Sequence, residues 1–472
     1  MSNDTFDLIV LGGGPAGVNA AIVAGLFGRR VALVERSLEI GGALVHTGTL
    51  PSKTLRETAL TLSGIRARKL EVDLKLRHDA TVADFLRHQR TVATTERDRL
   101  EGGLNNFGVQ VIQGTGRFVE PHTVEVEAPP KASRTVHAGV ILIATGSSPV
   151  HPPEFPFEHP RVYDSDEILS LAEMPRRMAV VGAGVIGSEY ACTFAALGVE
   201  LHLIDGRDTL LPFLDAELSQ ELARAMEWNG ITIHRKERVV KCSAPEVGEI
   251  EVELASGGIL EVDSVLVAGG RRSNTDSLNL KAAGIAPGER GLIKVDGRFR
   301  TEAPGIYAVG DVIGFPALAS TSMEQARLAV CDAFSIPFKR ELAALLPTGI
   351  YTIPEVSAVG ATEEELKKRG EDYVAGKALY RNNARGLIIG EQHGFLKLLF
   401  RRSDMKLLGV HVIGELATEV VHAGMMTMIC GGGAEELNHA CFNVPTLGDL
   451  YKVATYRAQI SRDRPDLLAG RA

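Results

Sequence analysis

The feature that most constrains the fold of this 472-residue chain is a glycine-rich motif that occurs twice. The motif Gly-x-Gly-x-x-Gly stands at residues 12–17 and again at residues 182–187, each time directly after an apolar run. Each copy leads into an expected helix and then into a second apolar run, which ends on Glu35 in one copy and on Asp205 in the other. Both acids follow the first glycine at the same spacing, since 35 − 12 and 205 − 182 are both 23. This internal repeat predicts two copies of one structural unit.

The order of strand, glycine turn, helix, strand and terminal acid is typical of a βαβ unit that binds a dinucleotide. The glycines permit a tight turn and a close approach to phosphate, and the helix N-terminus attracts the pyrophosphate. The acid accepts a hydrogen bond from a ribose hydroxyl. One bare glycine motif would be weak evidence, but two complete units predict an α/β fold with two Rossmann-like domains and two bound dinucleotides.

Composition places the chain among ordinary globular proteins and excludes some functions. A length of 472 residues exceeds what one hydrophobic core usually supports, so two or three domains are expected. The formal net charge of -8 argues against a general nucleic-acid binder. Residues 9–28 carry no charge, but glycines and a proline interrupt them, so we expect a strand, a turn and a helix rather than a membrane span.

The cysteines indicate a reducing compartment rather than a disulfide framework. The chain has 5 cysteines, an odd number, and none are in C-x-x-C spacing. We therefore expect them to be buried small hydrophobes, and no metal site is expected. Residues 2–7 lack the basic segment of a secretory signal, so we expect a cytoplasmic protein.

The stretch at residues 41–57 carries the most specific chemistry. It reads G-G-A-L-V-H-T-G-T-L-P-S-K and continues into a segment that Pro51 predicts to be a helix. The stretch resembles the pattern G-G-x-C-x-N-x-G-C-x-P-S-K of the FAD-dependent pyridine nucleotide–disulfide oxidoreductases, in which the lysine, here Lys53, lies beside the flavin. Leu44 and Thr49 occupy the two cysteine positions. A redox dithiol therefore cannot form here, and this site cannot reduce a disulfide by thiol exchange.

Within that family, the stretch is similar to the soluble pyridine nucleotide transhydrogenases, whose pattern is G-G-x-C-x-H-x-G-T-x-P-S-K. His46 and Thr49 match this pattern, whereas Leu44 departs from it. The resemblance implies an FAD enzyme that exchanges hydride between NADPH and NAD⁺ through flavin N5. It implies a ping-pong cycle in which NAD(H) and NADP(H) use one nucleotide site in turn, and a homodimer or higher homo-oligomer.

Further signatures extend the resemblance over residues 5–460. The segments that match flavin and nucleotide signatures of the family are residues 139–146, 264–274 and 301–311, and residues 319–333 are expected to form a helix whose N-terminal amides face the flavin. The family's C-terminal domain carries H-P-T-x-x-E, an acid–base pair that serves the dithiol. Val444 stands at the position of that histidine and cannot move a proton. His439 lies nearby, and we expect it to be a structural histidine.

The resemblance also implies how the chain is divided into domains. The expected parts are an FAD-binding domain in two pieces, residues 1–153 and 276–345, an NAD(P)-binding domain at residues 154–275, and a C-terminal α+β dimerisation domain at residues 346–472. Residues 58–100 are expected to be helical with a solvated charged face, and a charged, mobile tail is expected from Arg462.

The two motifs and the resemblance together imply a set of site residues. Lys53 and Glu189 are expected to pair at the flavin, where the lysine provides a positive field and the acid balances its charge. The expected FAD-binding residues are Gly12, Gly14, Pro15, Ala16, Gly17, Glu35, Arg36, Gly42, Thr49, Lys53, Thr145, Gly146, Gly310, Asp311 and Ala319. The expected NAD(P)-binding residues are Gly182, Gly184, Val185, Ile186, Gly187, Glu189, Asp205, Arg207 and Gly270.

Two residues after the second motif bear on which nucleotide binds. Asp205 suits the free 2′-hydroxyl of NAD, whereas Arg207 suits the 2′-phosphate of NADP. Having both is what a protein that accepts either nucleotide needs. The alternative is that Arg207 is a surface arginine paired with Asp208 or Asp215.

Two other functions stay open at this point. One is an NAD(P)H oxidase or a quinone or dye reductase, because such an acceptor needs only access to the flavin edge. The other is a redox sensor that binds both nucleotides without catalysis, which the complete signatures around Lys53, Glu189 and Asp311 disfavour.

Overall fold

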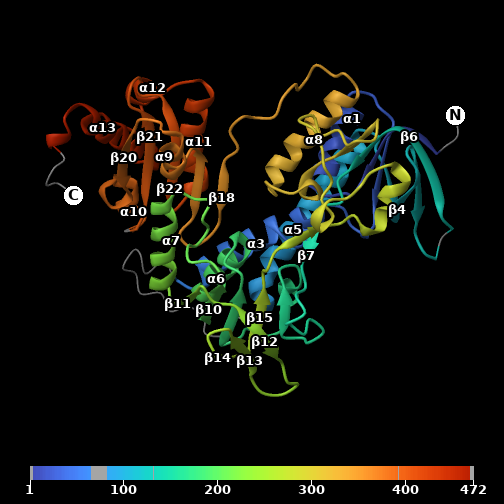
Figure 1. Cartoon of the computed structure of the whole chain (residues 1–472), viewed down its shortest axis with the longest axis horizontal. Helices are drawn as coiled ribbons and strands as arrows, with labels where there is room; N and C mark the ends of the chain where they lie inside the picture. The colour runs from blue at the N-terminus through green and yellow to red at the C-terminus, as the bar shows by residue number, and fades with distance from the viewer. Residues whose placement is uncertain (1–3, 65–81, 131, 392, 468–472) are drawn as a thin grey trace.

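The computed structural model describes residues 4–64, 82–130, 132–391 and 393–467. Figure 1 shows three lobes: a lobe that contains the N-terminal βαβ unit, a central lobe below it that contains the second unit, and a C-terminal lobe beside them. Part of the helical region expected at residues 58–100 is present as two helices, α3 (Thr49–Leu62) and α5 (Val82–Asn106). Residues 65–81 of that expectation lie outside the described residues. Within the described ranges, no helix has both the length and the apolar character that crossing a membrane requires.

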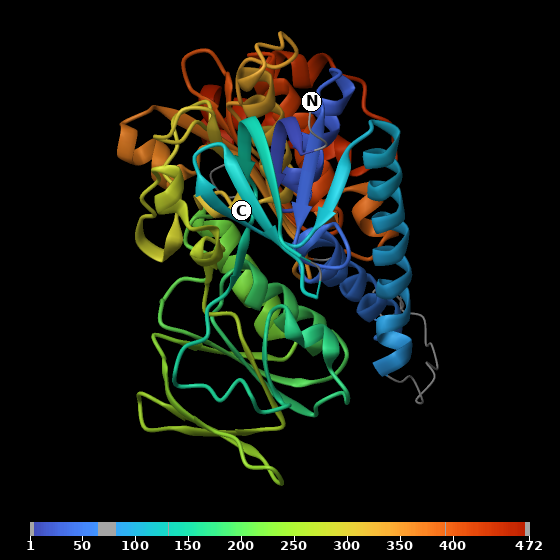
Figure 2. The same ribbon diagram turned by 90° about the vertical axis from the view of Figure 1, so that its right-hand side faces the viewer.

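The first lobe is built on a mostly parallel sheet, seen with α5 alongside it in Figure 2. The strand order is β3-β2-β1-β6-β5-β4, and β17 also pairs with β6. Strands β1 and β2 are buried on both faces, which explains their nearly continuous run of Val, Ile and Leu. The elements are β1 (Thr5–Leu11), α1 (Pro15–Leu26), β2 (Val31–Glu35), β3 (Gln110–Gln113), β4 (Thr115–Glu120), β5 (Thr123–Glu127), β6 (Arg134–Ile143), β17 (Ile306–Ala308) and α8 (Ala319–Ala333).

Helix α8 covers the same face of this sheet as α1. Its bounds, Ala319–Ala333, confirm the helix expected from the sequence. Ala20 and Ala24 of α1 share one core with Leu328 and Ala329 of α8. Because β17 pairs in parallel with β6, the chain returns to the first sheet after it has formed the second.

The central lobe repeats the βαβ arrangement. All strands of its main sheet are parallel, in the order β11-β10-β9-β15-β8, and a three-stranded antiparallel sheet packs on one face. The elements are β8 (Val162–Asp164), β9 (Arg177–Val181), α6 (Val185–Ala196), β10 (Glu200–Asp205), α7 (Ala216–Trp228), β11 (Ile231–Arg235), β12 (Val239–Ser243), β13 (Ile250–Leu254), β14 (Ile259–Val262) and β15 (Ser264–Val267). A two-stranded ribbon, β7 (Ser147–Pro149) with β16 (Arg271–Ser273), joins the two lobes.

The C-terminal lobe is an antiparallel sheet with helices on it, so this lobe is α+β. The strand order is β18-β19-β22-β21-β20. The strands are β18 (Thr348–Ile350), β19 (Val356–Gly360), β20 (Tyr373–Leu379), β21 (Phe395–Arg401) and β22 (Leu407–Ile413), and the helices are α9 (Glu363–Arg369), α10 (Ala384–Ile388), α11 (Ala417–Ile429), α12 (Ala434–His439) and α13 (Leu450–Asp463). Helix α13 includes Arg462, so the expected tail starts too early, and residues 468–472 lie outside the described residues.

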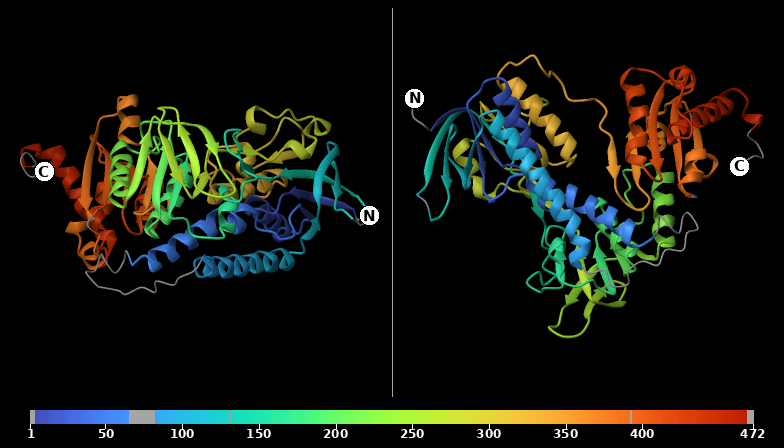
Figure 3. Two further views of the ribbon diagram at one scale, coloured as in Figure 1. Left: turned by 90° about the horizontal axis from the view of Figure 1, so that it is seen from below. Right: turned by 180° about the vertical axis from the view of Figure 1, so that it is seen from behind.

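Helix α3 lies where the three lobes meet, and Figure 3 shows it running alongside α5. Pro51 is in its first turn, as the sequence predicts. Leu55 and Ala59 of α3 share one core with Phe194 of α6 and with Ile350 and Ile353 of the C-terminal lobe. The helix that carries Lys53 is therefore fixed by all three parts of the fold.

Candidate functional site

The first glycine turn has the geometry that only glycine tolerates. Gly12 has φ +107, and a Cβ there would lie 2.4 Å from the Ala144 carbonyl oxygen. A Cβ on Gly17 would lie 1.8 Å from the Gly12 oxygen, so this glycine allows helix α1 to pack on the strand. A Cβ on Gly14, by contrast, would meet no atom nearer than 4.0 Å. The side of Gly14 that faces the N-terminus of α1 is therefore open to a phosphate group.

The second glycine turn repeats this geometry. Gly182 has φ +98, and a Cβ there would lie 2.5 Å from the Ala268 oxygen, while a Cβ on Gly187 would lie 1.9 Å from the Gly182 oxygen. A Cβ on Gly184 would have no atom within 4 Å. Val185 and Ile186 form the first turn of α6, where backbone amides lack partners within the helix.

The acids at the strand ends accept hydrogen bonds from backbone amides of the two glycine turns. Glu35 accepts a 2.6 Å hydrogen bond from the Gly13 amide, and Asp205 accepts a 2.6 Å hydrogen bond from the Ala183 amide. Each carboxylate thus lies at the glycine turn, where a bound nucleotide places its ribose. The neighbouring Arg36 is exposed.

The structure brings together the two residues expected to act at the flavin. Lys53 of α3 places Nζ 2.6 Å from Oε2 of Glu189, which lies on α6. The Glu189 side chain is 6% exposed and the Lys53 side chain 25%. The other oxygen of Glu189, Oε1, accepts a 2.9 Å hydrogen bond from the Tyr351 amide. Because this carboxylate has a partner on each oxygen, its burial leaves no unpaired charge.

Tyr351 is a residue that the sequence did not indicate. It follows β18 in the C-terminal lobe, and its ring lies 5.0 Å from Lys53 Nζ, within range of a cation–π contact. Burial raises the pKa of its hydroxyl. Only the folded arrangement reveals this contact, because Tyr351 lies far along the chain from both Lys53 and Glu189.

A buried arginine fastens α3 to the same segment of the C-terminal lobe. Arg56 is 2% exposed, and its Nε donates to the Thr352 oxygen at 3.0 Å. Its Nη1 lies 3.3 Å from Glu355 and 2.7 Å from Glu57. Burial raises the pKa of Glu355, although Arg56 opposes this shift. These contacts set the position of Lys53, one turn earlier on the helix.

Asp311, which was expected at the flavin's ribityl chain, belongs to a connected group at the ribbon between the lobes. Asp311 accepts a 2.9 Å hydrogen bond from Ser147 Oγ, which in turn accepts one of 2.9 Å from Arg271 Nε. Arg271 also pairs with Asp166 at 3.1 Å. Four further expected residues are positive-φ glycines: Gly42, Gly146 and Gly310, which were expected to bind FAD, and Gly270, which was expected to bind NAD(P). The Thr145 hydroxyl donates to the Asn274 oxygen, and Ala319 is the first residue of α8.

Leu44 and Thr49, at the cysteine positions of the family pattern, lie on either side of the turn into α3. Leu44 is buried in the core of the first lobe, whereas Thr49 is the first residue of α3 and is exposed. One expectation for other residues was wrong, because Cys430 and Cys441 are exposed rather than buried. His439, expected to be structural rather than catalytic, lies exposed at the end of α12.

Arg207 pairs with Asp205, two residues before it, rather than with Asp208 or Asp215, the partners considered from the sequence. Its Nε and Nη2 lie 2.8 Å and 2.7 Å from the two oxygens of Asp205. Burial would raise the pKa of Asp205, but hydrogen bonds from Arg207 and the Ala183 amide outweigh it and lower this pKa. Asp208 pairs with Lys236 and Asp215 with Lys397, so the alternative partners of Arg207 were wrong.

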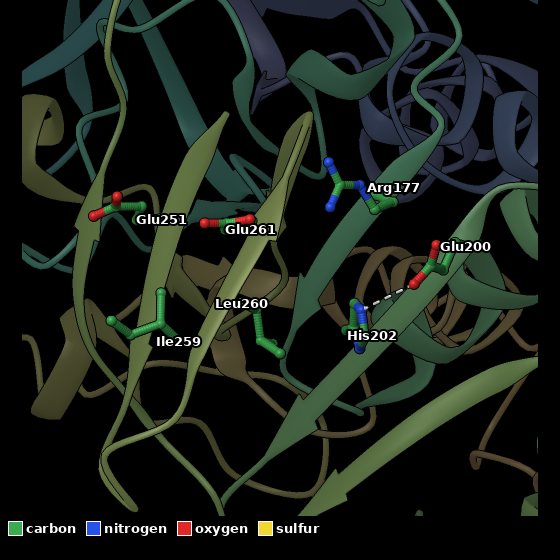
Figure 4. A pocket seen from close by; sticks show the side chains of 7 residues that line it. All are labelled: Arg177, Glu200, His202, Glu251, Ile259, Leu260 and Glu261. Carbon is green, nitrogen blue, oxygen red and sulfur yellow. Dashed lines mark ion pairs between the residues drawn. The ribbon is translucent and has the colours of Figure 1, made fainter. Parts of the chain in front are cut away.

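A hollow of about 310 Å³ on the central lobe is not the nucleotide site (Figure 4). Arg177 and Glu200, which line it with His202, are the first residues of β9 and β10. Ligands of open α/β sheets bind at the carboxyl ends of the strands, where the glycine turns are, and this hollow is at the opposite ends.

Comparison with known proteins agrees with this geometry. The sequence pattern of the pyridine nucleotide-disulphide oxidoreductases matches residues 6–327, and that of their dimerisation domain matches residues 346–455. The chain is 46% identical over 451 residues to a soluble pyridine nucleotide transhydrogenase of Mycobacterium tuberculosis (strain ATCC 25177 / H37Ra), covering 95% of this chain and 96% of that protein. It is 41% identical over 457 residues to one of Pseudomonas putida (strain KT2440), covering 96% and 97%.

Solved structures match over nearly the whole chain as well. LpdA from Mycobacterium tuberculosis superposes with a TM-score of 0.88 at 28% identity, covering 95% of this chain and 99% of that one. The HOCl-induced flavoprotein disulfide reductase RclA from Escherichia coli gives a TM-score of 0.85 at 27% identity, covering 95% and 99%. With its two Rossmann-like units and its C-terminal α+β dimerisation domain, the chain belongs to the pyridine nucleotide-disulphide oxidoreductase family.

Proposed function

We propose that this protein is an FAD-dependent NAD(P)⁺ transhydrogenase that exchanges hydride between NADPH and NAD⁺ without a redox disulfide. The observation that carries the proposal is the Lys53–Glu189 pair, which is kept in a chain whose cysteine positions hold Leu44 and Thr49. The two relatives described above, both named soluble pyridine nucleotide transhydrogenase, support it.

The residues of the first lobe fit an FAD molecule. The open face of Gly14 and the N-terminal amides of α1 would hold the pyrophosphate, Glu35 the ribose, and Asp311 the ribityl chain. When bound, FAD supplies at N5 the atom that accepts hydride from one nucleotide and returns it to the next. The second turn, around Gly184, would hold each nicotinamide nucleotide in turn, which is the basis of a ping-pong cycle.

Lys53 and Glu189 provide the fixed charges of the site. The Lys53 ammonium holds a positive field where negative charge develops, and it needs no reorganisation because Glu189 already fixes its position. Glu189 keeps this charge balanced and is itself held by the Tyr351 amide. Hydride transfer between nucleotides requires no proton donor to a substrate, so an exposed Val444 in place of a base is compatible with activity.

The thiols of the chain do not replace the missing dithiol. Cys192 is 3% exposed on α6, and burial raises the pKa of its thiol to about 12, which leaves it unreactive at neutral pH. Cys430 and Cys441 are exposed and are not in C-x-x-C spacing.

The other parts of the proposal concern assembly and layout. The chain forms a homodimer or higher homo-oligomer through residues 346–472, with FAD-binding residues 1–153 and 276–345 around the NAD(P)-binding residues 154–275. The match to the family's dimerisation domain supports the dimer. The protein acts in the cytoplasm, on NAD(H) and NADP(H).

The test is anaerobic stopped-flow absorbance of the bound flavin. NADPH should bleach the flavin of the holoenzyme, and NAD⁺ added in a second mixing step should restore its colour at a rate that accounts for turnover. Parallel double-reciprocal plots should accompany this result, since no complex holds both nucleotides. If a quinone or oxygen restores the colour orders of magnitude faster than NAD⁺ does, the protein is an acceptor reductase and the proposal fails.

A further inference from the structure

Three cations gather at the turn that follows β10, beside the expected position of the adenosine ribose. Arg207 belongs to this turn, and Lys236 and Arg238 belong to the loop after β11. Two backbone hydrogen bonds fasten the loop to the turn: the Lys236 amide donates to the Arg207 oxygen at 3.1 Å, and the Glu237 amide donates to the Asp205 oxygen at 3.0 Å. The two segments therefore form one surface.

Two of these cations already have partners. Arg207 uses Nε and Nη2 on Asp205, and this pairing raises the pKa of Arg207. Lys236 Nζ lies 2.8 Å from Asp208. Each of these side chains would have to break a contact before it could bind a ligand.

Arg238 is different. In the described part of the chain, no carboxylate lies within ion-pair distance of its guanidinium, and the residue is exposed. A Cβ built on Gly206 would lie 3.2 Å from Arg238 Nε and 3.9 Å from Nη2. The guanidinium thus lies over Gly206, the residue between Asp205 and Arg207, and the missing side chain of Gly206 makes room for it.

We propose that Arg238, rather than Arg207, receives the 2′-phosphate of NADP(H), and that Arg207 serves to neutralise Asp205. This inference rests on the proposed use of both nucleotides. An acid at the end of the second strand suits a ribose 2′-hydroxyl, and a nearby arginine is needed when a phosphate replaces it. A phosphate carries a charge of about -1.5 to -2 at neutral pH, so an unpaired Asp205 would repel it.

The pairing pattern explains how one site can serve both nucleotides. The Asp205–Arg207 pair carries no net charge, so it neither strongly attracts nor strongly repels a phosphate. Asp205 already accepts four hydrogen bonds, from the Ala183 amide and from Arg207, so a ribose 2′-hydroxyl would replace one of the bonds from Arg207. Arg238 adds the unpaired cation that only the phosphorylated nucleotide uses.

The experiment measures the binding of two redox-inactive fragments, 2′,5′-ADP and 5′-AMP, to the holoenzyme by calorimetry. These differ only in the 2′-phosphate, so the ratio of their dissociation constants isolates its contribution. Arg238→Gln should reduce the preference for 2′,5′-ADP about 10-fold to 100-fold, the effect of losing a charge-assisted hydrogen bond to phosphate. Gly206→Val, which keeps the charge but fills the space under the guanidinium, should reduce it in the same direction.

The matched control is Arg235→Gln, which removes an arginine from the same segment. Arg235 pairs with Glu227 of α7 at 2.8 Å and should leave the ratio unchanged. The inference is overturned if Arg238→Gln weakens both fragments equally, if it changes neither, or if Arg207→Gln alone abolishes the preference. A wild-type holoenzyme with no preference would overturn it as well.

The proposed function is tested separately, by hydride exchange from NADH to thio-NAD⁺ in the wild-type holoenzyme. That reaction involves no 2′-phosphate. If exchange occurs but the fragment test fails, only the role of Arg238 is rejected. If exchange does not occur, the transhydrogenase proposal is rejected, whatever the fragments show.

Discussion

The contact between Lys53 and Glu189 can be tested by a double-mutant cycle. Lys53→Met keeps most of the side-chain length but removes the charge, and Glu189→Gln keeps the shape but removes the counter-charge. In Glu189→Gln, the remaining oxygen can still accept from the Tyr351 amide, so the substitution acts mainly on the 2.6 Å contact with Lys53. Both variants should still bind FAD, because neither residue belongs to the glycine turn of the first lobe.

The magnitude follows from the geometry. A hydrogen bond between charged groups contributes about 1.5–3 kcal/mol when one partner is buried, and Glu189 is 6% exposed. The Lys53 side chain is 25% exposed, so solvent screens part of its charge and favours the lower half of that range. Each single substitution should therefore slow flavin reduction about 10-fold to 50-fold. The double mutant should be slowed by clearly less than the product of the two losses, because both remove the same contact.

The assay is the rate of flavin bleaching by NADPH under anaerobic, single-turnover conditions, which excludes product release. Lys377→Met is the matched control, since Lys377 also pairs with an acid, Glu217, but lies in the C-terminal lobe. It should leave the bleaching rate unchanged. Strictly multiplicative losses in the double mutant would show that Lys53 and Glu189 act independently, and the proposed pair would be rejected.

Three further predictions follow from other contacts. Alkylation of the native holoenzyme should modify the exposed Cys430 and Cys441 and leave NADPH-to-flavin hydride transfer nearly unchanged; loss of that step would show that a thiol takes part. Asp205→Asn should shift the ratio of kcat/KM values towards NADPH by about tenfold, because it replaces the charged acceptor for the 2′-hydroxyl by a neutral one and removes a negative charge near the 2′-phosphate, and a shift towards NADH would contradict this. Lys397, which contacts Glu363 at 2.5 Å, lowers the pKa of that carboxyl to about 2 although burial alone would raise it. The stability that Glu363 contributes is present above its unfolded pKa of about 4.3 and should be lost as the pH falls towards 2. The free energy of unfolding should therefore fall less between these pH values in Lys397→Met than in the wild type.

The parts of the fold that could be predicted are those with local signals. The glycines at positions 12 and 182 have φ values of +107 and +98, so the motif reports a backbone geometry directly. The helix at Ala319–Ala333 was predicted to the residue. The hydrogen bond from the Ala183 amide to Asp205 repeats the one from the Gly13 amide to Glu35. The same spacing between first glycine and acid therefore predicts both units.

The contacts that could not be predicted depend on how distant segments dock. Nothing near Tyr351 in the sequence marks its contact with Glu189, and nothing near Arg56 marks its burial against Glu355. The partner of Arg207 was missed for a different reason. Sequence proximity suggested several acids, and only the geometry of the turn selects Asp205.

The position of Glu189 explains why the Lys53–Glu189 pair can be present in a chain that lacks the dithiol. Its carboxylate joins three parts of the molecule: it lies on α6, accepts from Lys53 on α3, and accepts from the Tyr351 amide in the C-terminal lobe. The residues at the cysteine positions take part in none of these contacts, and Leu44 packs into the core of the first lobe. Removing Glu189 would instead leave the Lys53 cation without its counter-charge and the Tyr351 amide without its acceptor, at a junction that all three lobes build. The pair is therefore constrained by the docking of the lobes as well as by chemistry, whereas Leu44 contributes only to the core of the first lobe.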